Sequence, residues 1–287
     1  MLLVACNESA VVVPGLGDKI KYVVRVGTPM KRGEYAGPGI FFVLFIVAFA
    51  LTLLQSGDER GLQVVGDVFY VLFSGIAAVM GFFALRRFNR STLLGKTLLF
   101  VEIAVVLEFI AGFVWMVYQE VFGIIDPFPS LADIPWVLFY VAAIIAFVYP
   151  LRKVAQRMTA KHVAVWVVVA IALCAIVFNT IIVPIISDVE STFWLKVLSA
   201  VYPIGGVLLL LVAFALFLLL RNTALGPSFL VFVLAIASYG VADLLFTYTE
   251  YAGTYQTGSF IDVLYYLAQL MFAYGFYLQI ETSRNAE

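Results

Sequence analysis

Long apolar runs alternate with short polar breaks along most of the chain. Eight runs approach the roughly 20 apolar residues that are needed to cross a hydrocarbon layer of ~30 Å. They cover residues 39–54, 64–85, 93–118, 134–151, 163–186, 193–220, 229–249 and 260–280. The first run is the shortest, and no break is long enough to hold a folded domain outside a membrane. The pattern therefore predicts eight membrane-crossing helices that are joined as hairpins.

Composition places the chain in the same class. Hydrophobic residues make up 64% of the sequence, charged residues 12%, and the mean hydropathy is +1.06, far more apolar than a soluble domain. We expect an all-α integral membrane protein with the lipid bilayer as its surroundings. Residues 39–280 form the eight-helix bundle, residues 1–38 a cytoplasmic N-terminal segment and residues 281–287 a short cytoplasmic tail.

The basic residues predict the orientation of this bundle. Of the 17 Lys and Arg, only Arg60 and Lys196 fall on one side of the predicted membrane, and the other 15 fall on the opposite side. Because Lys and Arg accumulate in cytoplasmic loops, both termini are predicted to lie in the cytoplasm. The outer face is predicted to be acidic.

A short motif recurs where predicted helices begin. Asp67, Asp133 and Asp262 are each followed by Val or Ile and, three residues after the Asp, by Tyr or Trp. Ser130 precedes Asp133 by three residues and Ser259 precedes Asp262 by three, which matches a helix cap in which the Ser oxygen accepts a backbone N–H. The sequence therefore allows two roles for these carboxylates, helix capping and ligand binding.

Four polar side chains fall inside predicted helices, namely Glu102, Glu108, Asn179 and Asp243. An ionisable group in hydrocarbon costs at least ~2.5 kcal/mol, so each is expected to face other helices and to have a partner. For Glu108 the partner is expected to be Asn179 or a tyrosine hydroxyl. Glu102 and Glu108 are six residues apart and point to different helix faces, which argues against a catalytic carboxylate pair.

Asp243 is the strongest candidate for a functional site because no cap explains it. It lies seven residues before Glu250, about 10 Å inside the outer end of its helix. There it is within reach of Asp67, Asp133 and Asp262. We predict that the four carboxylates converge on an outward-facing mouth that binds a cation or another small ligand.

Signatures of enzymes and of cofactor sites are missing from the sequence. The single histidine, His162, excludes a multi-His metal site, and Cys174 has no neighbouring base in the sequence. No G-x-S-x-G or P-loop motif occurs, and residues 260–280 contain no lysine for a retinal Schiff base. The N-terminal basic residues suit anionic headgroups better than nucleic acid. We therefore expect neither an enzyme nor a nucleic-acid-binding protein, and the sequence leaves unknown whether a cofactor binds.

Four segments carry a family resemblance. PSLADIPWVLFYVAA from Pro129, VYPIGGVLLLL from Val201, VADLLF from Val241 and SFIDVLYYL from Ser259 resemble the multi-helix membrane region found ahead of GGDEF, EAL and histidine-kinase domains in bacteria and archaea. The resemblance implies a sensor in the plasma membrane of a prokaryote that passes a change to a cytoplasmic output. The residues that match its motifs are Ser130, Asp133, Tyr140, Tyr202, Pro203, Asp243, Asp262 and Tyr265.

Two features depart from that family. Gly205 and Gly206 stand where the family often has an acidic residue, and no output domain follows in this sequence. We therefore expect a separate cytoplasmic signalling protein as partner, with a truncated sensor as an open alternative. The competing function is a small transporter or proton-coupled carrier that uses Glu102, Glu108 and Asp243. Unwinding of the helix near Pro203, around a polar cavity, would favour transport.

Overall fold

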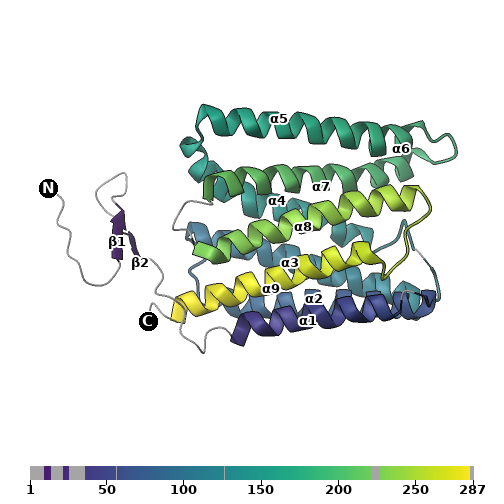
Figure 1. Cartoon of the computed structure of the whole chain (residues 1–287), viewed down its shortest axis with the longest axis horizontal. Coiled ribbons are helices and arrows are strands. Elements are labelled where there is room, and N and C mark those ends of the chain that lie inside the picture. The colour runs from purple at the N-terminus through teal and green to yellow at the C-terminus, as the bar shows by residue number, and fades with distance from the viewer. Residues whose placement is uncertain are drawn as a thin grey trace.

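The computed structural model describes residues 10–13, 22–25, 36–55, 57–125, 127–220 and 226–284. Helices dominate this part of the chain (Figure 1). The long helices are α1 (Ala36–Leu54), α2 (Glu59–Leu85), α3 (Leu93–Glu120), α4 (Asp133–Val154), α5 (Ala160–Val177), α7 (Phe193–Leu220), α8 (Gly226–Tyr251) and α9 (Phe260–Arg284). Shorter pieces are a 3-10 turn (Ala155–Arg157), a π-helical turn (Phe178–Ile182) and α6 (Val183–Ser187). Two short antiparallel strands, β1 (Ala10–Val13) and β2 (Tyr22–Arg25), stand apart from the helices.

Membrane-length helices account for most of the described residues. Seven of the described helical segments are long and apolar enough to cross a bilayer, and α1 contributes a shorter apolar stretch, Gly39–Leu54. Large apolar side chains such as Phe42, Leu54, Val168 and Ile171 are exposed on their surfaces. Outside a membrane such surfaces would be costly, so the helices fit a lipid bilayer.

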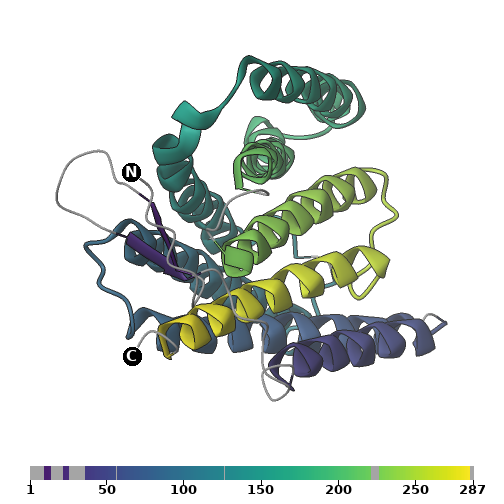
Figure 2. The same cartoon turned by 60° about the vertical axis from the view of Figure 1, so that its left-hand side comes forward.

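Six helices of the described chain form a closed ring. Each of α2, α3, α4, α7, α8 and α9 contacts the next in that order, and α9 returns to α2. Helix α1 packs on the outside against α9 and α2, and α5 packs outside α7 (Figure 2). A functional site at one end of this ring can therefore draw side chains from six helices.

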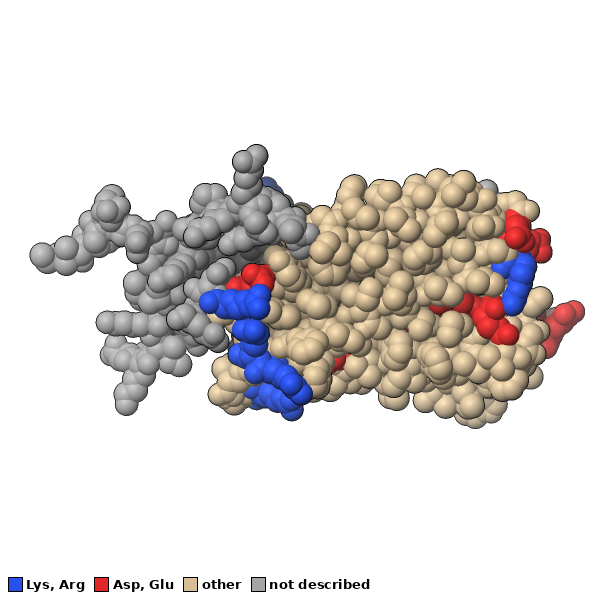
Figure 3. Space-filling view, turned by 90° about the horizontal axis from the view of Figure 1, so that it is seen from below, with Lys and Arg blue, Asp and Glu red and all other residues tan. Residues whose placement is uncertain are grey.

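Charge separates the two ends of the ring (Figure 3). The basic end carries Arg86, Arg87, Lys153 and Arg284, which lie at or near the ends of α2, α4 and α9. The opposite end, here called the acidic end, contains the N-terminal ends of α2, α4 and α9. The first residue of α1 and the last described residue of α9 lie at the basic end (Figure 1).

Apolar side chains fill the half of the ring that is nearer the basic end. Leu98, Leu216, Phe232 and Phe276 have no exposed surface there. The rings of Phe232 and Phe276 meet edge to face with centroids 5.0 Å apart. This half is a close-packed core, in contrast to the acidic end.

Some predicted boundaries are wrong. Helix α2 begins at Glu59 rather than at residue 64, so Asp67 lies two turns inside its helix and does not begin it. The run 163–186 divides into α5, the π-helical turn and α6. Helix α7 continues through Pro203 without unwinding.

The paired strands β1 and β2 lie within the predicted N-terminal segment and were not predicted. The rest of residues 1–35, Asp126 and residues 285–287 lie outside the described residues. The structure therefore does not test the prediction for those parts of the N-terminal segment and the C-terminal tail.

Candidate functional site

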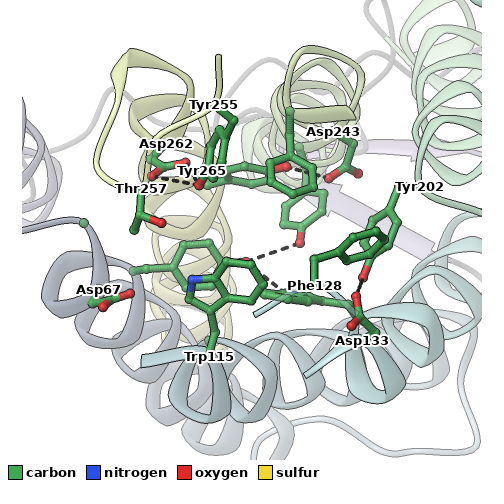
Figure 4. A pocket seen from close by; sticks show the side chains of 16 residues that line it. Asp67, Trp115, Phe128, Asp133, Tyr202, Asp243, Tyr255, Thr257, Asp262 and Tyr265 are labelled. Carbon is green, nitrogen blue, oxygen red and sulfur yellow. Dashed lines mark hydrogen bonds between the residues drawn. The ribbon is translucent and has the colours of Figure 1, made fainter. Parts of the chain in front are cut away.

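A pocket opens among the six ring helices at the acidic end (Figure 4). Its empty volume is about 610 Å³, which includes space open to solvent. The 16 lining residues are Gly66, Asp67, Tyr70, Gly112, Trp115, Phe128, Asp133, Trp136, Tyr202, Tyr239, Asp243, Phe246, Tyr255, Thr257, Asp262 and Tyr265. The structure thus brings Asp67, Asp133, Asp243 and Asp262 to one pocket, on different sides of it.

Asp133 is fixed in the pocket wall by the start of α4. Its Oδ2 accepts the backbone N–H of Ser130 at 2.5 Å, and the Ser130 hydroxyl oxygen accepts the N–H of Ala132 at 3.2 Å. Ser130 and Asp133 are thus paired as predicted, and the carboxylate lies at the positive end of the helix dipole, but the N-cap position of α4 itself is Ala132, which has no side-chain cap. The hydroxyl of Tyr202, from α7, donates to the other oxygen. Both oxygens of Asp133 therefore have donors.

Asp243 joins three helices. Tyr140 of α4 donates its hydroxyl to Oδ2 at 2.8 Å, and Tyr265 of α9 donates to Oδ1 at 2.8 Å. Gly205 of α7 makes room for this arrangement, because a Cβ at that position would lie 2.5 Å from the Tyr140 ring. Any change at Asp243 acts directly on the contacts among α4, α8 and α9.

Glu108 of α3 lies deeper and is also held by aromatic donors. Tyr239 donates its hydroxyl to Oε2 at 2.6 Å, and Tyr70 donates to Oε1. Trp136 donates its indole N–H to the Tyr70 hydroxyl at 3.1 Å. The predicted tyrosine partner of Glu108 is therefore present. The alternative prediction, that Asn179 pairs with Glu108, is wrong.

The connection between α8 and α9 covers one side of the pocket. Asp262 Oδ2 accepts the N–H of Gly258 at 2.5 Å, and Asp262 Oδ1 accepts the Tyr255 hydroxyl at 3.0 Å. Burial, followed by the charge of Asp262, raises the pKa of the Tyr255 hydroxyl well above its ordinary value, so Tyr255 stays a donor. Gly258 has φ +85° and sits against α2, where a Cβ would lie 1.9 Å from the Leu62 carbonyl oxygen. The Ser259 hydroxyl has no partner among the described residues, so its predicted capping role is wrong.

Asp67 of α2 differs from the other three pocket aspartates. It is 3% exposed, and its Oδ2 finds no hydrogen-bond donor in the described part of the chain. Glu120, Asp262 and Arg60 are close enough to act on its charge, and the Glu120 side chain also lies at hydrogen-bonding distance from the Asp67 carboxyl group. Arg60, however, is paired with Glu120 at 2.5 Å. Asp67 therefore lines the pocket and has a buried carboxylate oxygen, Oδ2, without a donor in the described part of the chain.

Two predicted intramembrane residues lie away from the pocket. Glu102 of α3 is buried near the basic end against Gly81 and Phe276, and its Oε2 has no partner within the described chain. Glu102 is therefore buried, as predicted. The predicted hydrogen-bond partner is missing for its Oε2 atom. Asn179 is exposed and donates to the Ala175 carbonyl of its own helix at 2.7 Å, so the expectation that it faces other helices is wrong.

Several lining residues were not singled out in advance, above all Trp115, Tyr239 and Tyr255. The sequence could have indicated Tyr70 and Trp136 as pocket residues, because each stands three residues after an aspartate of the repeated motif. It could not have indicated Trp115 and Tyr239, since an aromatic residue in a membrane helix is usually part of an interfacial belt or the packed core.

The donor set limits what the pocket can bind. No three His, Cys, Asp or Glu side chains among the described residues are close enough together to hold a metal ion. The pocket instead offers carboxylates, tyrosine hydroxyls and aromatic faces. No protein-family description, curated protein or solved structure matches this chain.

Proposed function

We propose that this chain is a sensory module of a prokaryotic plasma membrane. It binds a small ligand in the pocket at its acidic end and relays that binding to a separate cytoplasmic signalling protein, without catalysis. The proposal includes eight membrane-spanning helices, with α1 as the shortest. It also places the acidic end outside the cell and both termini in the cytoplasm, in line with the resemblance to sensor regions.

The charge map supports this orientation. The basic end carries the clusters at Arg86 and Arg87 and at Arg152 and Lys153, as expected for cytoplasmic loops. The start of α1 and the end of α9 both lie at the basic end. If α1 crosses the membrane, the chain therefore crosses it an even number of times.

The observation that carries the proposal is the contrast between the two halves of the ring. The acidic half contains a pocket whose wall carries four aspartates among aromatic rings, whereas the basic half is filled by buried side chains such as Leu98, Leu216 and Phe232. A ligand that enters the pocket meets a packed core. Such a site suits binding and release at one face better than passage through the ring.

A relay from this site has to move whole helices. Tyr140 and Tyr265 both donate to Asp243, so the positions of α4, α8 and α9 depend on one carboxylate. Helices α8 and α9 then run from the pocket to the basic end. A ligand that favours one of two packings separated by a few kcal/mol would shift those ends.

Hydrogen–deuterium exchange of the Asp243→Asn variant tests this relay. Asn keeps one acceptor oxygen, so one of the two tyrosines loses its acceptor while the side-chain shape is retained. We expect altered exchange in residues 229–236 and 276–284, at the basic ends of α8 and α9. Asp188→Asn, at a partly exposed aspartate in the α6–α7 connection outside the pocket, is the matched control. Unchanged exchange at both basic ends of the Asp243 variant would refute the relay.

Proton-coupled transport is the second candidate because Glu102 places a buried carboxylate with an unpartnered oxygen in the basic half. Continuity of α7 through Pro203 removes one predicted feature of a carrier. Proteoliposomes with a pH-sensitive dye inside separate the two functions. A carrier would take up protons under an imposed membrane potential and lose this activity in Glu102→Gln. The sensor is expected to show no such flux.

A further inference from the structure

The chemistry of the pocket wall defines a ligand class. The described residues that line the pocket include four aspartates and no Lys, Arg or His. Nine of the 16 lining residues are aromatic. A wall of this kind repels anions and attracts cations through both its carboxylates and the faces of its rings.

Hydrogen bonding distinguishes one carboxylate from the rest. Asp133, Asp243 and Asp262 each accept a tyrosine hydroxyl, from Tyr202, from Tyr140 and Tyr265, and from Tyr255, respectively. Asp67 accepts no such bond, and its Oδ2 is unpartnered within the described residues. A buried acceptor without a donor is costly, and a ligand that supplies the missing positive charge removes that cost.

Arg60 does not take this role. Its guanidinium bonds both oxygens of Glu120, at 3.1 and 2.5 Å, and Gln63 also donates to Glu120 at 3.2 Å. Arg60 is therefore held at the rim by Glu120, and it is not among the residues that line the pocket.

We propose that the pocket binds a small organic ammonium ion, whose charge lies against Asp67 and whose apolar groups lie against the aromatic walls. This inference rests on the proposed function and specifies its ligand. A bare metal ion fits less well, because no three ligating side chains come together among the described residues. Trp115 and Trp136 offer the best ring faces for such a cation.

The two pocket tryptophans also provide the measurement. The protein in nanodiscs, with Trp166→Phe and Trp194→Phe to leave only Trp115 and Trp136, is titrated with choline, with ethanolamine in its protonated form, and with 3,3-dimethylbutan-1-ol. The last compound has the shape of choline without its charge. We expect a saturable fluorescence change with at least one cation and none with the neutral compound in the same range. This comparison needs no change at the site itself.

Asp67→Asn then tests the anchor. It should weaken cation binding about tenfold or more, because an ion pair with a buried carboxylate is lost. Asp188→Asn, the same change at the same end of the molecule, should bind as the unaltered chain does. No saturable response to either cation, an equal response to the neutral compound, or an unchanged Asp67→Asn would overturn the inference.

The outcomes also separate this inference from the proposed function. Equal binding of the neutral compound would leave a ligand-binding pocket but remove the charge-based class. Cation binding that depends on Asp67, without any change at the basic ends of α8 and α9, would uphold the ligand class and refute the relay.

Discussion

Pairing between tyrosines and carboxylates is the main residue-scale feature of the site. Glu108, Asp133, Asp243 and Asp262 each accept a tyrosine hydroxyl, whereas the described chain provides no buried Lys or Arg partner for them. Hydroxyl donors satisfy a buried carboxylate without adding a second charge to the membrane interior. Packing and hydrogen bonding therefore share the same aromatic side chains.

Removing one of these hydroxyls should cost stability. Tyr239→Phe deletes a donor 2.6 Å from Glu108 and leaves its Oε2 without that bond. We expect a loss of about 1.5–3 kcal/mol and a lower thermal unfolding temperature in nanodiscs. Tyr248→Phe, an exposed position on the same helix, should be nearly neutral. Equal effects of the two changes would contradict the role given to this bond.

The sequence predicted the carboxylates of the site better than their partners. The free-energy cost of a charged group in hydrocarbon was enough to predict that Asp243 faces the inside of the bundle. The repeated motif identified Asp67, Asp133 and Asp262. It did not reveal Tyr239, whose partner Glu108 lies 131 residues away in the chain. Asn179 was misplaced because it satisfies its amide on the Ala175 carbonyl, so a polar residue in an apolar run did not need another helix.

Helix contacts at the scale of elements depend on small residues. Helices α7 and α8 approach each other at Gly206 and Gly240, just beside Asp243. A Cβ on Gly240 would lie 2.8 Å from the Gly206 carbonyl oxygen and 2.9 Å from Leu210 Cγ. Any side chain there forces the two helices apart.

Gly240→Ala should therefore lower the thermal unfolding temperature although Ala favours helices. Gly39→Ala is the matched control, since a Cβ at Gly39 of α1 meets nothing within 4 Å. Both changes gain about the same ~1 kcal/mol of helix propensity, so their difference isolates the α7–α8 contact. An unfolding temperature for Gly240→Ala at or above that of Gly39→Ala would contradict this packing.

The lengths of the apolar runs predicted where the helices lie. They did not predict where a helix departs from regular α geometry. Pro203 was a candidate break, yet α7 is continuous through it. The irregular turn lies at Phe178–Ile182, just before Pro184, where a wider π-turn accommodates the missing N–H of a proline. Residue type alone does not tell which of two prolines distorts its helix, because neighbouring helices decide it.

At the scale of the whole molecule, the basic residues predict the topology. A reporter that is active only outside the cytoplasm should work when fused after Asp188, at the acidic end, and fail when fused after Arg284. A reporter that is active only in the cytoplasm should give the opposite pattern. Activity of the external reporter after Arg284 but not after Asp188 would invert the orientation and place the pocket in the cytoplasm.

The central claim is that binding in the pocket moves the basic end of the ring. Spin labels at Lys153→Cys of α4 and Arg284→Cys of α9, both exposed, measure the distance between those ends after Cys6 and Cys174 are replaced by Ala. In nanodiscs, choline at concentrations that change the fluorescence of Trp115 and Trp136 should shift the distance distribution, and Asp67→Asn should remove the shift. An unchanged distribution at saturating choline would contradict the account.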